Sequence, residues 1–136
     1  MPLSRMVAVG ATLLTQTAAL SAELWQAPNS PFMLGEAYPG RSATCETVKH
    51  WIDKAPQIDA RITFAIEGNL VAAEWDGALA YLVMCDETGV QVMCITYSKD
   101  GRNVGDRVLF AGGYQRVGEL RIMLDPCLAS VVDVPG

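Results

Sequence analysis

The amino-acid sequence predicts a mainly β domain, a five-stranded barrel preceded by one amphipathic α-helix, with a signal-peptide helix at the N-terminus. Three observations predict it. From residue 61 onward, short runs rich in β-branched and aromatic residues alternate with turn signals. Residues 48–55 repeat apolar side chains with helical spacing. Residues 1–22 carry an early arginine, an uncharged run and small residues, in the order of a secretory signal.

The predicted signal segment contains Arg5, and an uncharged run over residues 7–20 follows. This run is shorter than the roughly 20 residues that a membrane-spanning helix needs, and small residues follow it rather than a basic patch. We therefore expect a cleaved signal, no stable membrane anchor afterwards, and a periplasmic or secreted protein. Small residues allow cleavage after Ser21 or after Ala22, and the sequence leaves both open.

Removal of residues 1–22 would leave about 115 residues, enough for one domain that buries roughly 65% of its unfolded surface. The predicted signal segment contains one arginine and no acidic residue, so its loss changes the formal net charge from -5 to -6. Phosphate backbones are bound by clustered positive charge, so this balance disfavours a nucleic-acid partner.

Residues 23–41 contain three prolines and two glycines. Such a composition predicts an irregular lead-in that lies over the surface of the domain. Aromatic residues of this segment, among them Trp25 and Phe32, are expected to pack against the core.

One amphipathic helix is predicted over residues 42–55, at the start of the single domain expected over residues 42–136. Ser42 is a plausible N-cap and Pro56 ends the pattern. The apolar stripe consists of Val48, Trp51, Ile52 and Ala55. Cys45 lies one turn before this stripe, on the same buried face. His50 lies off the stripe and is expected to be solvated.

The next segment predicts a meander of three strands. The first covers residues 61–74 and contains Gly68, where a missing side chain lets a long strand bend sharply. Asp76-Gly77 is a hairpin signal. The second and third strands are expected over residues 78–85 and 90–97.

Two further strands follow a longer polar connection. Residues 98–106 are polar and contain glycines, and a fourth strand is predicted over residues 107–114. A turn at Val117-Gly118 leads to a fifth strand over residues 119–124. Pro126-Cys127 is expected to close this strand, and the tail to Gly136 to be loosely held.

The four cysteines are Cys45, Cys85, Cys94 and Cys127. In an oxidising compartment an even number of cysteines indicates two disulfides, with three pairings open. Thiolates with His50 are the alternative, as a zinc site, but no C-x-x-C pair occurs and the spacings of 40, 9 and 33 do not resemble a zinc ribbon. Free buried thiols are the remaining alternative. We expect neither a metal nor another cofactor.

Five strands, a bent first strand and a long connection between the third and fourth are typical of an OB-fold barrel. Residues 64–128 also resemble the "tRNA_anti-like" family, small exported OB-like domains of bacteria. The similarity covers about half of the chain. It rests on four motifs: Glu67-Gly68-Asn69-Leu70, Val92-Met93-Cys94, Gly105-Asp106-Arg107-Val108 and Leu124-Asp125-Pro126-Cys127.

An OB barrel implies a disulfide pairing. Its third and fifth strands are parallel neighbours, so Cys94 and Cys127 are expected within the roughly 5.5 Å Cα separation of a disulfide. This leaves Cys45 to pair with Cys85, which would tie the helix to the second strand.

Catalytic groups are sparse in this sequence. His50 is the single histidine and lies near no recognisable nucleophile motif. Neighbouring carboxylates occur at Glu74 and Asp76 and at Asp86-Glu87, but both pairs fall in predicted turns, where acidic residues are ordinarily solvated. We therefore expect no catalytic residues and no enzyme activity.

An OB barrel offers the outer face of its first three strands and the flanking loops as a binding surface. The candidates for stacking contacts are Trp75, Tyr81 and Tyr97, and those for polar contacts are Arg61, Arg107 and Arg116. The alternative is that these aromatic residues pack within the barrel or across strands.

The prediction is thus an exported, disulfide-stapled OB-like binding or accessory module. Its expected partner is a protein, a peptide or an envelope component. The alternative is a host- or stress-associated exported factor without catalytic activity of its own, such as a nodulation-efficiency protein.

Overall fold

The computed structural model describes residues 26–85 and 89–132. The signal segment, both cleavage sites, Trp25 and the acidic pair Asp86-Glu87 lie outside the described residues. Among the helices that are described, none is long and apolar enough to cross a membrane.

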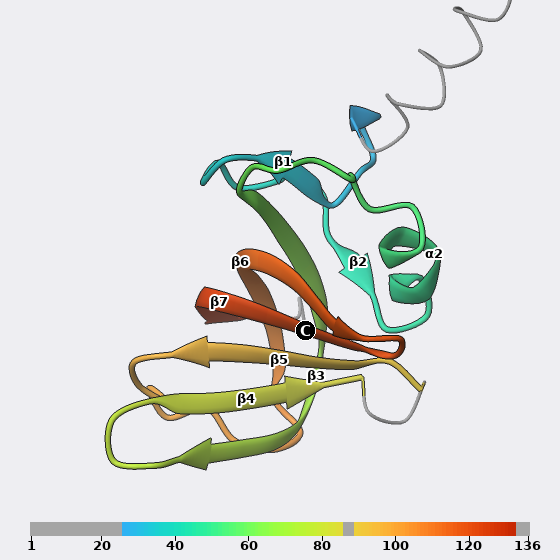
Figure 1. Ribbon diagram of the computed structural model, residues 1–136. Coiled ribbons are helices and arrows are strands. Elements are labelled where there is room, and N and C mark those ends of the chain that lie inside the picture. The colour runs from blue at the N-terminus through green and yellow to red at the C-terminus, as the bar shows by residue number, and fades with distance from the viewer. Residues whose placement is uncertain (1–25, 86–88, 133–136) are drawn as a thin grey trace, which may run out of the picture.

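Five strands close into a barrel, and this confirms the predicted mainly β, OB-like fold (Figure 1). The barrel strands are β3 (Ile62–Trp75), β4 (Ala80–Met84), β5 (Gln91–Thr96), β6 (Arg107–Gly118) and β7 (Arg121–Val131). They neighbour one another in the order β3-β4-β5-β7-β6, and β6 pairs again with β3. β5 and β7 are parallel, whereas the other pairs in the barrel are antiparallel.

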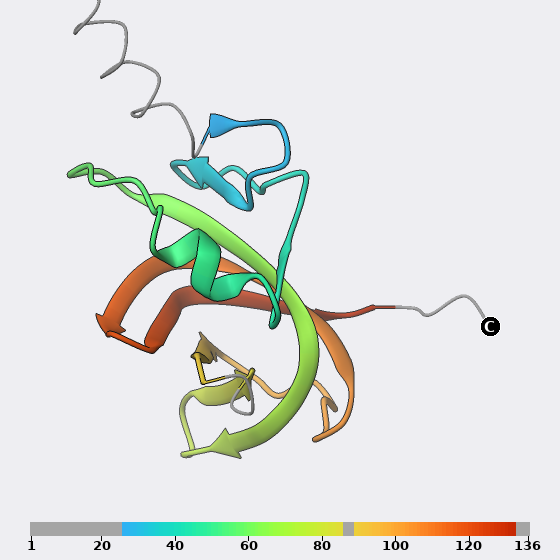
Figure 2. The ribbon, with the colours of Figure 1, turned by 90° about the vertical axis from the view of Figure 1, so that its right-hand side faces the viewer.

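The long strand β3 curves around the barrel and belongs to two pairs (Figure 2). Its first half pairs with β6 from Thr63 to Asn69, and its second half pairs with β4 from Leu70 to Trp75. Gly68 lies just before this change of partner. A Cβ atom there would lie 3.0 Å from the Cys45 sulfur and 3.0 Å from the Met84 sulfur, so the packing requires glycine.

The interior is filled by alternate residues of the barrel strands, because successive side chains of a strand point to opposite faces. The largest fully buried side chains include Phe64, Phe110, Ile66, Leu70, Leu82, Met84, Ile122 and Leu124. Complete burial of one such side chain is worth roughly 1.5–3 kcal/mol, so this set supplies most of the driving force for folding.

One short strand, β1 (Phe32–Leu34), corrects the prediction of an irregular lead-in over residues 23–41, and a second, β2 (Ala43–Thr44), lies within the predicted helix 42–55. β1 pairs antiparallel with the start of β3, and β2 pairs parallel with its middle. Phe32 is buried, as predicted, and its ring lies 4.8 Å from that of Phe64.

The helix α2 (Val48–Ile52) is shorter than the predicted 42–55, and Ser42 is not its N-cap. The reason is that residues 43–44 are held by β3, and the backbone N–H of Thr44 donates to the Thr47 hydroxyl at 2.9 Å. The helix therefore begins after Thr47. The predicted stripe is correct in direction, because Val48 and Ile52 are buried while His50 is exposed.

The last strand extends well past its predicted end at residue 124. Asp125-Pro126 lies opposite an irregularity in the β6–β7 register between Gly112 and Tyr114. Beyond it the chain pairs with β6 again, up to Val131. Pro126 was therefore wrong as a strand terminator, and residues 128–131 are held in the sheet rather than loosely.

Both disulfides are present. Cys45 is bonded to Cys85 with a Cα separation of 5.1 Å, and Cys94 to Cys127 with 5.4 Å. This is the pairing that the OB resemblance implies. The second disulfide lies where β5 and β7 separate, since their pairing ends at Cys94 and Leu124.

Candidate binding groove

The outer face of β3, β6 and β7 has a floor of small side chains. Ala65 pairs with Ala111, which in turn pairs with Leu128, so two alanines and a leucine cross the three strands in one row. The next row contains Leu109 and Ser130. Because alanine fills little space above a sheet, this floor is recessed.

Residues 38–42 run along one side of this recess. With the floor residues they line a cavity of about 380 Å³. A second cavity of about 350 Å³ shares Tyr38, Ala111 and Leu128 and extends to Tyr97. We call the combined feature the Tyr38–Leu128 groove. Its lining includes Tyr38, Arg41, Ala65, Leu109, Ala111 and Leu128, together with Arg61, Tyr97 and the carboxylate residues Glu36 and Glu67.

Large apolar side chains project around this groove instead of packing inside it. Tyr38 is 60% exposed, Leu128 59% and Tyr97 74%. Isolated exposed apolar residues are ordinary on proteins, but a contiguous set around a recess indicates an interaction site. The groove is therefore the described surface with the strongest physical case for binding.

Local structure positions the groove. The Thr63 hydroxyl donates to the Gly35 carbonyl at 2.7 Å and so ties the segment before Tyr38 to β3. The Arg61 guanidinium lies over Gly113, where a Cβ atom would approach it to 3.3 Å. Glycine at this position thus leaves the space that the arginine occupies.

Two arginines line the groove. Arg61 lies 3.8 Å from the Glu36 carboxylate, a long ion pair at the surface. Arg41 has no ion pair among the described residues. The nearby carboxylate of Glu67 forms an ion pair with Arg107 at 2.7 Å. An apolar ligand that also carries a negative group matches this distribution.

The structure brings together two of the six residues that the sequence analysis proposed for binding. Arg61 and Tyr97 both line the second cavity. Trp75 lies at the end of β3 and is 47% exposed, and Tyr81 is on β4, so this pair belongs to the β3–β4 hairpin instead. Arg107 is held by Glu67 and by the Asn69 side chain.

Tyr81 closes the β3–β4 hairpin through Asp76. Its hydroxyl donates to one Asp76 carboxylate oxygen at 2.9 Å, and the other oxygen accepts the N–H groups of Ala78 and Leu79 at 2.8 and 2.7 Å. The bonds from Leu79, Ala78 and Tyr81 hold the pKa of Asp76 below its ordinary value. These hydrogen bonds stabilise the fold when the pH is above the pKa that Asp76 has in the unfolded chain. Their contribution is lost as the pH falls through the lower pKa of Asp76 in the folded protein.

Replacing Tyr81 by Phe is expected to raise the pKa of Asp76 towards its ordinary value, because one of the three bonds to the carboxylate is lost. NMR titration of the Asp76 carboxyl carbon measures this directly. Tyr97→Phe is the matched control and should leave this pKa unchanged. An unaltered Asp76 titration in the Tyr81 variant would show that the hydroxyl does not donate to this carboxylate in solution.

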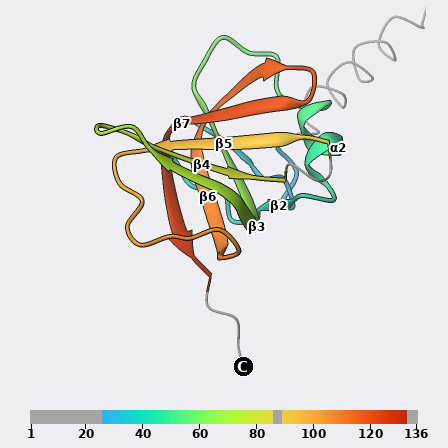
Figure 3. The ribbon, with the colours of Figure 1, turned by 90° about the horizontal axis from the view of Figure 1, so that it is seen from below.

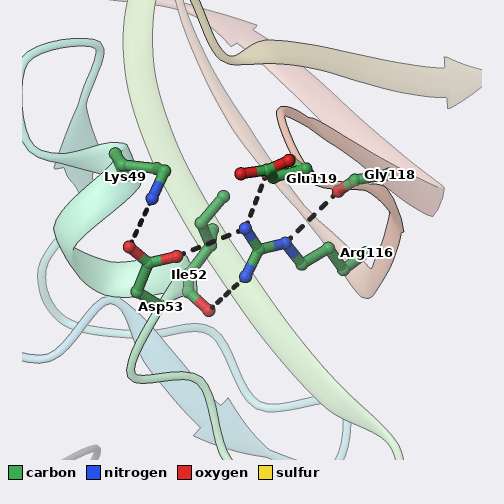
Figure 4. Close-up of polar contacts among 6 residues, drawn as sticks. All are labelled: Lys49, Ile52, Asp53, Arg116, Gly118 and Glu119. Carbon is green, nitrogen blue, oxygen red and sulfur yellow. Dashed lines mark hydrogen bonds and ion pairs between the residues drawn. The ribbon is translucent and has the colours of Figure 1, made fainter.

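Arg116 fastens the β6–β7 turn to α2 (Figure 4). Its guanidinium lies 3.2 Å from the Asp53 carboxylate and donates to the Ile52 carbonyl at 3.3 Å. It also donates to the carbonyls of Gly118 and Glu119 at 3.3 and 2.6 Å. The pKa of Asp53 is lowered by the hydrogen bond from Lys49 and, to a smaller extent, by Arg116. In this arrangement the Arg116 side chain holds α2 and the β6–β7 turn together.

Replacing Arg116 by Ala is expected to cost about 1–2 kcal/mol of unfolding free energy, because the partly buried contact with the Ile52 carbonyl and two exposed carbonyl contacts lose a charged donor. Arg116→Lys keeps the charge near Asp53 but not the planar set of donors, so we expect an intermediate loss. Urea denaturation measures both. Equal stability of the Ala variant and the wild type would contradict the described network.

Sequence reasoning missed Tyr38 and Leu128. Tyr38 lies in the segment predicted to be irregular, and Leu128 in the tail predicted to be loose. Residues 127–132, Cys-Leu-Ala-Ser-Val-Val, show no clear alternation of apolar and polar residues, and Pro126 precedes them, so no strand signal marked Leu128.

No group of three or more His, Cys, Asp or Glu side chains within the described residues is placed to hold a metal ion. His50 lies on the exposed side of α2, with its ring 5.3 Å from that of Trp51. No protein-family model matches the chain, and no curated protein shows significant similarity to it.

Proposed function

We propose that this protein is an exported, disulfide-stapled binding or accessory module that holds a protein or peptide segment of the cell envelope in its Tyr38–Leu128 groove. The observation that carries the proposal is the recess in the barrel's outer face, floored by Ala65 and Ala111 and flanked by exposed Tyr38 and Leu128. Two disulfides within a small barrel support a periplasmic or secreted location.

Membership of the tRNA_anti-like family is part of this proposal. It is supported by the OB-like barrel and by the places of the shared motifs. Gly68 lies where β3 changes partner, and Cys94 and Cys127 are bonded to each other.

Affinity capture of partners from an envelope fraction tests the proposal. Leu128→Asp introduces a charge beside the floor of the groove, and it should be tolerated because Leu128 is mostly exposed. Trp75→Ala is the matched control, since it removes an exposed aromatic side chain outside the groove. The proposal expects partners to be lost with the Leu128 variant and kept with the Trp75 variant.

The reverse pattern, with partners lost only from the Trp75 variant, would place the binding site on the β3–β4 hairpin. Partner sets that are identical for wild type and Leu128→Asp would also contradict the proposal. Thermal melts of both variants ensure that a loss of binding is not a loss of fold.

A further inference from the structure

The last part of β7 is an edge of the sheet. β5 pairs with β7 only as far as Leu124, whereas β6 pairs with it as far as Val131. Figure 3 shows the final part of β7 running beside β6 and away from β5. Among the described strands, residues 127–131 therefore have a neighbour on one side only.

The register shows which backbone groups face outward. The N–H of Val132 donates to the Arg107 carbonyl at 3.0 Å, and the pairing is regular from Val131 back to Cys127. Hydrogen-bonded and non-hydrogen-bonded pairs alternate in an antiparallel ladder. Leu128 and Ser130 therefore bond to β6, and the N–H and C=O groups of Ala129 and Val131 point away from the sheet.

Pro126 and the irregular β6–β7 register lie just before this edge, but residues 127–131 themselves carry no feature that blocks pairing. Natural edge strands are commonly blunted by charged side chains, prolines or bulges. Residues 127–131 are Cys-Leu-Ala-Ser-Val, without a charge or a proline. Leu128 is 59% and Val131 is 53% exposed. The edge thus offers both unpaired backbone groups and apolar contact area to another strand.

The neighbouring groove indicates the chemistry of that strand. A strand added beside β7 places alternate side chains on the outer face, next to Leu128. Arg41 lines the same groove and has no ion pair among the described residues. A carboxylate on the incoming strand complements it. A second copy of residues 127–131 contains no carboxylate, and two copies of an acidic chain repel each other.

We propose that β7 extends its sheet by accepting an extended segment of a partner polypeptide along residues 127–131, with an apolar side chain beside Leu128 and a carboxylate at Arg41. This inference rests on the proposed function and names the binding mode of the same site. Backbone hydrogen bonds supply affinity in this mode, and alternate side chains supply specificity.

A decapeptide phage library panned against the oxidised, processed protein supplies the probe, and selected peptides are then measured by fluorescence anisotropy. Ala129→Pro removes one outward N–H and leaves the pairs with β6 intact, because proline is tolerated where a strand's N–H faces solvent. Ala129→Val is the matched control that keeps the N–H. We expect peptides with alternating apolar residues and one acid, and about tenfold weaker binding to the Pro variant alone.

Three outcomes overturn the inference. If panning enriches no peptide, the edge accepts no strand. If selected peptides bind Ala129→Pro as tightly as wild type but lose affinity for Leu128→Asp, the groove binds through side chains, and the proposed function stands without strand addition. A concentration-dependent dimer in sedimentation, abolished by Ala129→Pro, would make a second copy the occupant.

Discussion

Removal of the Cys94–Cys127 disulfide is expected to lower the free energy of unfolding by about 3–4 kcal/mol, the largest effect of any substitution considered. In the chain-entropy description, closing a loop of 33 residues lowers the conformational entropy of the unfolded chain, and this raises the free energy of unfolding by roughly 3–4 kcal/mol. The disulfide also joins β5 to β7 at the point where their pairing ends. A domain of this size has a total stability of only about 5–15 kcal/mol.

The double variant Cys94→Ala and Cys127→Ala measures this effect without leaving a free thiol. Its melting temperature under oxidising conditions should fall by roughly 10 °C or more. Wild-type protein with both disulfides reduced is the reference, and it should be no more stable than the variant. A variant with the same melting temperature as the oxidised wild type would contradict the structural role of this disulfide.

Replacing Gly112 by Ala is expected to cost about 2–3 kcal/mol. A Cβ atom there would lie 2.6 Å from the Pro126 carbonyl oxygen and 2.9 Å from the Cys127 Cα, so it would push against backbone. These contacts occur where the β6–β7 register is irregular, beside the edge formed by the last residues of β7.

Gly118→Ala is the matched control in the same strand, because its Cβ would make an ordinary contact of 3.5 Å with the Arg121 side chain. Urea denaturation should show a lower midpoint for the Gly112 variant and little change for the Gly118 variant. Equal midpoints would mean that β6 and β7 do not approach each other this closely.

Local signals in the sequence predicted most of the barrel. Asp76-Gly77 marked the β3–β4 hairpin, and Gly68 marked the region where β3 bends, because turns and close approaches restrict the residue types that fit. The helical stripe identified the buried face of α2 through Val48 and Ile52. These features depend on a few neighbouring residues and can therefore be read from one chain.

Other features depend on pairings between distant segments. Ser42 resembles a helix cap, but pairing of residues 43–44 with β3 moves the helix start to Val48. A proline ordinarily ends a strand, yet the glycines of β6 leave room for β7 to continue past Pro126.

The groove was not predictable for the same reason. The groove joins Ala65, Ala111 and Leu128 from three strands, and only the register shows that they form one row. The charge of Arg107 and Arg116 favours a binding role, but these side chains form ion pairs with Glu67 and Asp53. Sequence patterns identify side chains that can bind a ligand, and tertiary structure decides which of them remain available.

The most direct test of the binding site is an NMR titration of the ¹⁵N-labelled, oxidised protein with the selected decapeptides. We predict that the largest amide shift changes fall at Ala129 and Val131 and along residues 38–42. Changes centred on residues 75–80 of the β3–β4 hairpin, with the β7 edge unaffected, would contradict the assignment of the Tyr38–Leu128 groove as the binding site.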